Sequence, residues 1–196
     1  IYKDIKINKC LIKVNKKTII ENLIENIPLN KRQNITIVLG FNSNKIKHET
    51  KKYKVKYIHN KNYSKTEMLY SAYLALKKYN DDLFFSYTDI LYEKNFFNSF
   101  IKKKFNKITI PINLNWLRTW KLRKQKIKED AETLKYKGRK LLEIGKKIKR
   151  IKDVKGQYMG IFYIPRTERK KILSYVKQAK YKKKQLTFFL NDLLNN

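Results

Sequence analysis

The sequence predicts a single three-layer α/β/α domain with a mostly parallel mixed sheet, spanning residues 1–196. Short β-branched apolar runs alternate with segments of helical periodicity, and this alternation indicates strands covered by helices on both faces. The chain has 196 residues, of which 42% are hydrophobic and 13% aromatic, enough for the core of one such domain. No apolar run approaches the ~20 residues of a membrane helix, so no membrane partner is expected.

The first half of the chain supplies two predicted helices and two predicted strands. Thr18 and Glu21 form a capping-box pattern, and apolar residues follow at helical spacing until Pro28. Residues 34–40 form an apolar run closed by glycine, typical of a strand buried on both faces. A second capping-box pattern over 64–67 predicts a helix with its apolar face at Met68, Leu69, Ala72, Tyr73, Ala75 and Leu76. A strand ending near residue 87 follows.

The second half predicts further elements in the same alternation. Helices are expected around 96–101, 166–178 and 185–194, and strands at 107–113, 139–144 and 158–164. The basic segment 116–128 is interpreted as an exposed helix or excursion. Because the chain starts without an apolar leader or an initiator Met, we interpret it as cytoplasmic and as beginning partway into a larger protein.

Asp89 is the first candidate for chemistry. It follows the apolar run that ends near Tyr87, and Glu93 lies four residues further on. In open α/β sheets, ligands bind outside the carboxyl ends of the strands, and a carboxylate there can hold a hard cation against a phosphorylated ligand. The alternative is that Asp89 caps a helix or is a solvated loop carboxylate. Glu93 is interpreted as a helix-start acid that complements the helix dipole.

The net charge of +32 favours polyanion binding on its own, because such a field attracts nucleic acids. The charge comes from 41 Lys against only 7 Arg, beside 24 Ile and 19 Asn, which are all residues with A/T-rich codons. Arg is the residue favoured for bidentate phosphate and base recognition. A solvated lysine-rich surface is therefore the preferred interpretation, and a nucleic-acid-binding module with stacking tyrosines stays an alternative.

The cysteine and histidine content excludes some classes of site. The single Cys10 cannot form an internal disulfide, and His48 and His59 have no cysteine partners at zinc-finger spacing. Nothing in the sequence places a base beside Cys10, so a buried side chain is preferred over a nucleophile.

Five separated stretches, in order along the chain, resemble the nucleotidyltransferase family that activates phosphorylated small molecules, particularly its phosphocholine and phosphonate cytidylyltransferase-like branch. They are Lys9 to Asn15, Tyr63 to Ser71, Tyr87 to Tyr92, the segment from Trp116 and Trp120 through Arg123 to Asp130-Ala131-Glu132, and the pair Leu142 to Lys147 and Asp153 to Gly160. The resemblance implies a Rossmann-like fold and transfer of a nucleotidyl group from an NTP, with CTP favoured, to phosphocholine, a phosphonate or a sugar phosphate. Pyrophosphate is the second product.

The resemblance also implies roles for individual residues. Asp89 would bind Mg²⁺, and Lys9 would contact the triphosphate and the leaving pyrophosphate. Thr66 and Tyr87 belong to the stretches that would contact the nucleotide. The acceptor would meet Lys146 through its phosphate, and Glu132 or Asp130 through its cationic or hydroxyl group. Trp116, with Trp120, would pack around a choline-like head group by cation-π contact, although an i, i+4 pair is also typical of a helix or core contact.

The chain departs from the family pattern at several positions. Thr88 stands where the family generally has glycine, and Asn113 where it often has aspartate. The glycine-rich phosphate loop would precede Ile1 and the second metal-binding aspartate would follow Asn196, so we expect the domain to be incomplete at both ends. These departures leave open a catalytically inactive binding protein that keeps the fold.

Overall fold

The N-terminal elements form a hairpin that leads into a capped helix. The computed structural model describes residues 8–123, 126–177 and 184–194. A 3₁₀ turn, η1 (Lys9–Leu11), precedes the antiparallel strands β1 (Lys13–Val14) and β2 (Lys17–Thr18) and the helix α1 (Ile19–Asn26). The Thr18 hydroxyl accepts from the Glu21 backbone N–H, and the Glu21 carboxylate accepts from the Thr18 backbone N–H. The predicted capping box is confirmed, and the helix ends before Pro28.

The next unit is the parallel pair of strands β3 (Thr36–Leu39) and β4 (Lys56–His59). The 3₁₀ turn η2 (Leu29–Asn34) precedes β3, and α2 (Ser43–Thr50) with the turn η3 (Lys51–Tyr53) connects the two strands. The predicted strand is present, but only Ile37 and Leu39 are fully buried, so β3 alternates instead of being buried on both faces. Helix α2 and strand β4 were not predicted, because lysines obscure the periodicity of both segments.

Helix α3 (Met68–Lys78) begins later than predicted. The second capping-box prediction is wrong, because Ser64 lies in the 3₁₀ turn η4 (Tyr63–Lys65) and Glu67 is the N-cap without a side-chain capping hydrogen bond. The buried face of α3 consists of Leu69, Ala72, Ala75 and Leu76, as predicted. Tyr73 is half-buried, whereas Met68 is 43% exposed.

Strand β5 (Leu83–Ser86) pairs antiparallel with β10 (Ile161–Ile164), and α4 (Lys94–Lys102) follows β5 where a helix was predicted. Only β6 (Ile112–Asn113) and an isolated bridge between Thr109 and Tyr163 form in the predicted strand 107–113. Pro111 has no N–H to donate between them. β6 pairs antiparallel with β9 (Gln157–Tyr158). The α/β class is confirmed. The expectation of a mostly parallel sheet is not met among the described strands, because β3 and β4 pair in parallel whereas the other four strand pairs are antiparallel.

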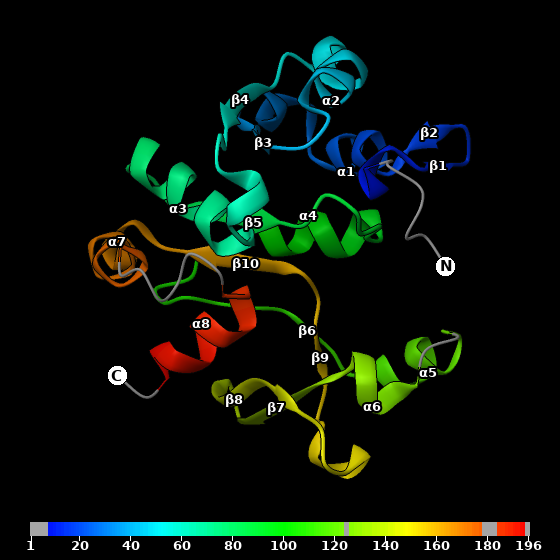
Figure 1. Cartoon of the computed structure of the whole chain (residues 1–196), viewed down its shortest axis with the longest axis vertical. Helices are drawn as coiled ribbons and strands as arrows, with labels where there is room; N and C mark the ends of the chain where they lie inside the picture. The colour runs from blue at the N-terminus through cyan, green and yellow to red at the C-terminus, as the bar shows by residue number, and fades with distance from the viewer. Residues whose placement is uncertain (1–7, 124–125, 178–183, 195–196) are drawn as a thin grey trace.

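The remaining elements are two short helices with a β-hairpin, which lie at the end of the molecule opposite β3 and β4, and two C-terminal helices. The helices α5 (Trp116–Lys121) and α6 (Ile127–Asp130) lie near the antiparallel hairpin of β7 (Glu132–Lys137) and β8 (Lys140–Lys147), far from β3, β4 and α2 (Figure 1). The turn η5 (Ile151–Asp153) leads to β9, and η6 (Arg166–Glu168) leads to α7 (Arg169–Val176). The last helix is α8 (Leu186–Leu193). The predicted helix end at residue 178 lies outside the described residues.

Strand β10 shows why the domain has three layers. Its residues are all buried, and they alternate between two apolar clusters. Phe162 and Ile164 pack in the cluster built with α3, α7 and α8, whereas Ile161 and Tyr163 pack in the cluster built with α1 and α4. Helices therefore cover both faces, as the strand-helix alternation predicted. Over the residues that the structure describes, no helix combines the length and apolarity that crossing a membrane requires.

Candidate active site

Asp89 lies in the turn that follows β5. The Tyr87 backbone N–H donates to the Gly160 carbonyl at 2.9 Å, which extends the pairing with the β10 segment by one residue. Gly160 has φ +71°, and a Cβ there would lie 2.3 Å from Ile90 Cδ1, so only glycine allows the turn to pack this closely. The Asp89 side chain is exposed and has no hydrogen bond or ion pair within the described part of the chain. Its carboxylate is free to bind a ligand.

The segment that carries Lys9 packs against this turn. Cys10 is buried, and burial raises the pKa of its thiol, while a hydrogen bond from the Thr88 side chain acts in the opposite direction. The Asp89 charge raises the same pKa. The fold thus brings Lys9-Cys10 and Thr88-Asp89 together from distant parts of the sequence. The buried interpretation of Cys10 is confirmed.

A cleft of about 1030 Å³ joins these residues. Its lining includes Lys9, Cys10, Tyr87 and Asp89, together with Met68 and Ser71 from the first turns of α3. Apolar residues of α1, β3 and β5 form much of the rest of its wall. A cleft of this size with a lysine and a free carboxylate suits a polyanionic ligand bound together with a cation.

Thr66 lies in the loop between β4 and α3 and is not among the residues that line this cleft. Its hydroxyl donates to the Asn62 carbonyl at 2.9 Å and accepts from Asn60 Nδ2 at 3.1 Å. These hydrogen bonds give Thr66 a role in holding the loop, and its contact with the nucleotide stays a prediction. Asn60 was not among the predicted site residues, and it is almost fully buried.

A second group of polar side chains surrounds Tyr87 and Glu132. Burial raises the pKa of the Glu132 carboxyl, which accepts a hydrogen bond from the Thr187 hydroxyl at 3.2 Å. Burial also raises the pKa of Tyr87, and the negative charge of Glu132 adds to this rise. The Tyr87 ring meets the Tyr158 ring edge-to-face, with centroids 6.0 Å apart. The Tyr158 hydroxyl is buried without a hydrogen-bond partner among the described residues, and the sequence carried no signal for it.

Asp130 and the two tryptophans lie on the α5–α6 segment. Asp130 pairs with Arg123 at 2.6 Å, and Arg123 stacks on Trp120 at 3.8 Å from the ring centroid. Trp116 is 4% exposed and packs in a core cluster with Ala131. The i, i+4 spacing was compatible with a ligand contact or with a core contact, and the structure shows the core contact. The rings of Trp116 and Trp120 meet edge-to-face. The structure does not bring Trp116 to the cleft lining that holds Asp89.

Lys146 lies on β8 and pairs with a carboxylate of the same strand. Glu143 accepts from Lys146 at 2.9 Å and from Lys135 at 3.1 Å. These two cations lower the pKa of Glu143 to about 2. The Lys146 side chain remains 59% exposed, and its contact with an acceptor phosphate stays a prediction.

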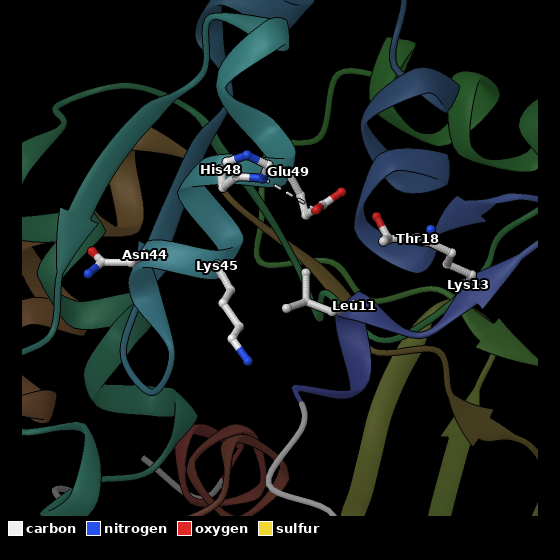
Figure 2. A pocket seen from close by; sticks show the side chains of 7 residues that line it. All are labelled: Leu11, Lys13, Thr18, Asn44, Lys45, His48 and Glu49. Atoms are coloured by element: carbon white, nitrogen blue, oxygen red, sulfur yellow. Dashed lines mark ion pairs between the residues drawn. The ribbon is translucent and has the colours of Figure 1, made fainter.

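A separate pocket of about 350 Å³ lies between α2 and the N-terminal hairpin (Figure 2). In Figure 2, Leu11 lies between the side chains of α2 and those of Lys13 and Thr18. His48 Nδ1 lies 3.5 Å from Glu49 Oε1 in this pocket. None of the predicted site residues lines it. Its lining residues are Leu11, Lys13, Thr18, Asn44, Lys45, His48 and Glu49.

The residues present fit a magnesium ion that is shared with a phosphorylated ligand. Within residues 8–123, 126–177 and 184–194, no three His, Cys, Asp or Glu side chains cluster as a complete metal cage. Mg²⁺ typically uses only one or two carboxylates and takes its other ligands from substrate phosphates and water. Asp89, exposed and unpaired at the cleft, would be one such carboxylate, and its binding of Mg²⁺ stays a prediction.

Comparison with known proteins identifies one sequence relative. The chain is 30% identical over 161 residues to the CTP:phosphoglutamine cytidylyltransferase of Campylobacter jejuni subsp. jejuni serotype O:2, a match that covers 79% of the chain. It covers 63% of the relative, so the chain spans less than two thirds of that protein's length. No family model matches the chain.

Solved structures share the fold. A Bacillus anthracis protein provisionally named glucose-1-phosphate thymidylyltransferase superposes with a TM-score of 0.72 at 17% identity, over 100% of this chain and 78% of its own. The CTP:phosphocholine cytidylyltransferase of Streptococcus pneumoniae superposes with a TM-score of 0.59 at 19% identity, over 95% of this chain and 76% of its own. These structures show that the chain has the fold of nucleotidyltransferases, and the sequence match supports a relation to that family.

Proposed function

We propose that this protein transfers a nucleotidyl group from an NTP, with CTP favoured, to a phosphorylated small molecule and releases pyrophosphate. One observation carries the proposal: the unpaired Asp89 carboxylate and the Lys9 segment line the same cleft. The cytidylyltransferase names of the sequence relative and of one structural neighbour support CTP as the donor.

In the proposed reaction, an acceptor phosphate oxygen attacks the α-phosphorus of the NTP. The bond from the α-phosphorus to the bridging oxygen of the β-phosphate breaks, and pyrophosphate leaves with that oxygen. The acceptor phosphate is already ionised near neutral pH, so the protein has to position the reactants and offset their charges. Lys9 would stabilise charge on the leaving pyrophosphate. Mg²⁺ held by Asp89 would supply charge neutralisation of the phosphates.

The polar group around Glu132 is the proposed binding site for the part of the acceptor that is remote from its phosphate. A half-buried carboxyl and the buried Tyr158 hydroxyl can both bind a hydrogen-bond donor such as an amide, an ammonium or a hydroxyl group. Asp130 and Lys146, which pair with Arg123 and Glu143, are secondary candidates for acceptor contact.

A pyrophosphate-release assay tests the proposal directly. The purified protein is incubated with CTP, ATP, GTP or UTP and with phosphoglutamine, phosphocholine, aminoethylphosphonate or a sugar phosphate, in the presence of Mg²⁺. Turnover with at least one pair is expected, and Asp89→Asn should lower kcat/KM by at least about a hundredfold. Glu93→Gln is the matched control, because Glu93 is an exposed carboxylate four residues away that makes no side-chain cap hydrogen bond. Equal losses in both variants would contradict the role of Asp89.

The alternative is a protein that keeps the fold and binds nucleotides without turnover. Thr88 and Asn113 favour it, because both depart from the residues that the family generally or often has at these positions. CTP binding by calorimetry, with no pyrophosphate release from any pair, would support it. The nucleic-acid alternative loses support, since Tyr63 is the one exposed tyrosine in the described ranges and stacking requires open rings.

A further inference from the structure

Asn60, directly after β4, is 2% exposed, and its polar atoms all have partners. Its Oδ1 accepts from the Asn62 backbone N–H at 3.0 Å, and its Nδ2 donates to Thr66 Oγ1 at 3.1 Å and to Ser71 Oγ at 3.3 Å. Its backbone N–H donates to the Leu39 carbonyl at 2.8 Å. We call these four hydrogen bonds the Asn60 clip. A buried side-chain amide without hydrogen-bond partners lowers the stability of the fold. The clip therefore favours the one geometry in which all of its hydrogen bonds form.

The clip connects the end of β3 to the first turns of α3. Ser71, one of its partners, lines the cleft that holds Asp89. The loop it organises packs directly on Gly40, where a Cβ would lie 2.7 Å from the Tyr63 Cβ. The next residue, Phe41, accepts through its carbonyl from Asn8 Nδ2 at 2.9 Å, and Asn8 precedes Lys9. One wall of the cleft and the Lys9 segment therefore meet at the same end of β3.

We propose that Asn60 is a positioning residue for the nucleotide. It touches neither Lys9 nor Asp89 through any hydrogen bond within the described part of the chain. Its hydrogen bonds fix loop 60–66 and the start of α3 before the ligand arrives, which lowers the entropy cost of binding. Asn60 therefore sets affinity for the NTP and takes no part in the transfer step. The inference rests on the proposed nucleotidyl transfer.

Asn60→Ala is the first test, with steady-state kinetics for the donor and the acceptor measured separately. Losing the amide removes the acceptor of the Asn62 N–H and the donor to the Thr66 and Ser71 hydroxyls, so we expect KM for CTP to rise about tenfold or more. The kcat should stay within about threefold and KM for the acceptor should not change, because an early binding element acts on ground-state affinity. Asn62→Ala is the matched control: its exposed side chain makes no hydrogen bond in the ranges described, and the clip uses only its backbone.

Asn60→Asp separates positioning from folding. A carboxylate can still accept from the Asn62 N–H, and the Ser71 hydroxyl can turn to donate to it, so KM for CTP should fall between those of wild type and Asn60→Ala. Thermal unfolding checks that each variant is folded at the assay temperature. An unchanged KM for CTP in folded Asn60→Ala, or a loss confined to kcat, would overturn the inference and leave the proposed function standing.

An inactive wild-type protein would instead overturn the proposed function. Calorimetry with CTP then decides the inference alone: weaker CTP binding by Asn60→Ala than by Asn62→Ala supports it, and equal binding or no binding by any variant refutes it.

Discussion

The pH dependence of the link between α1 and η3 provides a stringent check on the electrostatics of the fold. The Glu21 side chain is 7% exposed, and its carboxylate contacts Lys52 Nζ at 2.5 Å and the Thr18 N–H at 2.8 Å. Burial alone would raise the pKa of Glu21, but hydrogen bonds from Lys52 and Thr18 outweigh it and lower the pKa from 4.5 to about 2. Since α1 lines the cleft through Ile20 and Ile24, this link also supports the site.

The sign of the effect follows from the lowered pKa. A carboxyl whose pKa is depressed in the folded state contributes stability that is present above pH 4.5 and lost as the pH falls towards 2. The difference between the two pKa values corresponds to about 3 kcal/mol at pH 7, of which about 2 kcal/mol is lost by pH 3.

The variant Glu21→Gln isolates the charge, because glutamine also completes a capping box. We expect it to lower the free energy of unfolding by about 1–3 kcal/mol at pH 7 and by clearly less at pH 3, measured by urea denaturation. Lys52→Gln should lower the free energy of unfolding at pH 7 by part of the same amount, because it removes the cation that pairs with Glu21. The exposed pair of Glu129 and Lys126 provides the control, since Glu129→Gln should change stability by less than about 0.5 kcal/mol. An equal cost of Glu21→Gln at both pH values would refute the reasoning.

Three further variants probe the site. Gly160→Ala should destabilise the fold by about 1–3 kcal/mol and reduce turnover, because a Cβ at φ +71° would displace Ile90 beside Asp89; thermal unfolding and the pyrophosphate assay measure both. Tyr158→Phe removes a buried hydroxyl without a partner in the described ranges, so stability should stay within about 1 kcal/mol while KM for the acceptor rises. A loss of stability without a change in KM would count against an acceptor role. Lys146→Ala should raise KM for the acceptor more than Lys147→Ala does, and equal effects would leave Lys146 as a partner of Glu143 alone.

Two capping-box patterns show what local sequence can predict. At Thr18 and Glu21 the pattern forms as expected, because the hydrogen bonds of the Thr18 hydroxyl within the described ranges are all to Glu21. At residues 64–67 the same pattern fails, because Thr66 bonds to Asn60 and Asn62 and the loop packs on Gly40. Tertiary contacts outweigh a capping preference of about 1 kcal/mol. Gly40 and Asn60, which directly follow β3 and β4, lie outside the four-residue pattern.

The candidate site likewise contains residues that have a local sequence signal and residues that have none. The position of Asp89 after a strand was predictable because an apolar run followed by a carboxylate is a local signal, and the apolar face of α3 followed from its period; the role of Asp89 stays a prediction. Asn60 and Tyr158 were not predictable, because their roles depend on partners distant in sequence, namely Ser71 for Asn60 and Tyr87 for Tyr158. Trp116 carried a sequence signal that fitted both a ligand contact and a core residue. Only the packing against Ala131 distinguishes the two.

The departure at Thr88 has a physical explanation within this chain. Glycine is required at a turn when φ is positive or when a neighbour leaves no room for Cβ. Thr88 is not among the described non-glycine residues with positive φ, and its exposed side chain has room to interact with the Cys10 thiol. Threonine therefore fits the turn without strain and connects it to the segment that carries Lys9. The substitution is compatible with a working site. The inactive alternative then rests mainly on Asn113, whose Oδ1 accepts from the Asn115 N–H and which is not among the residues that line the cleft of Asp89.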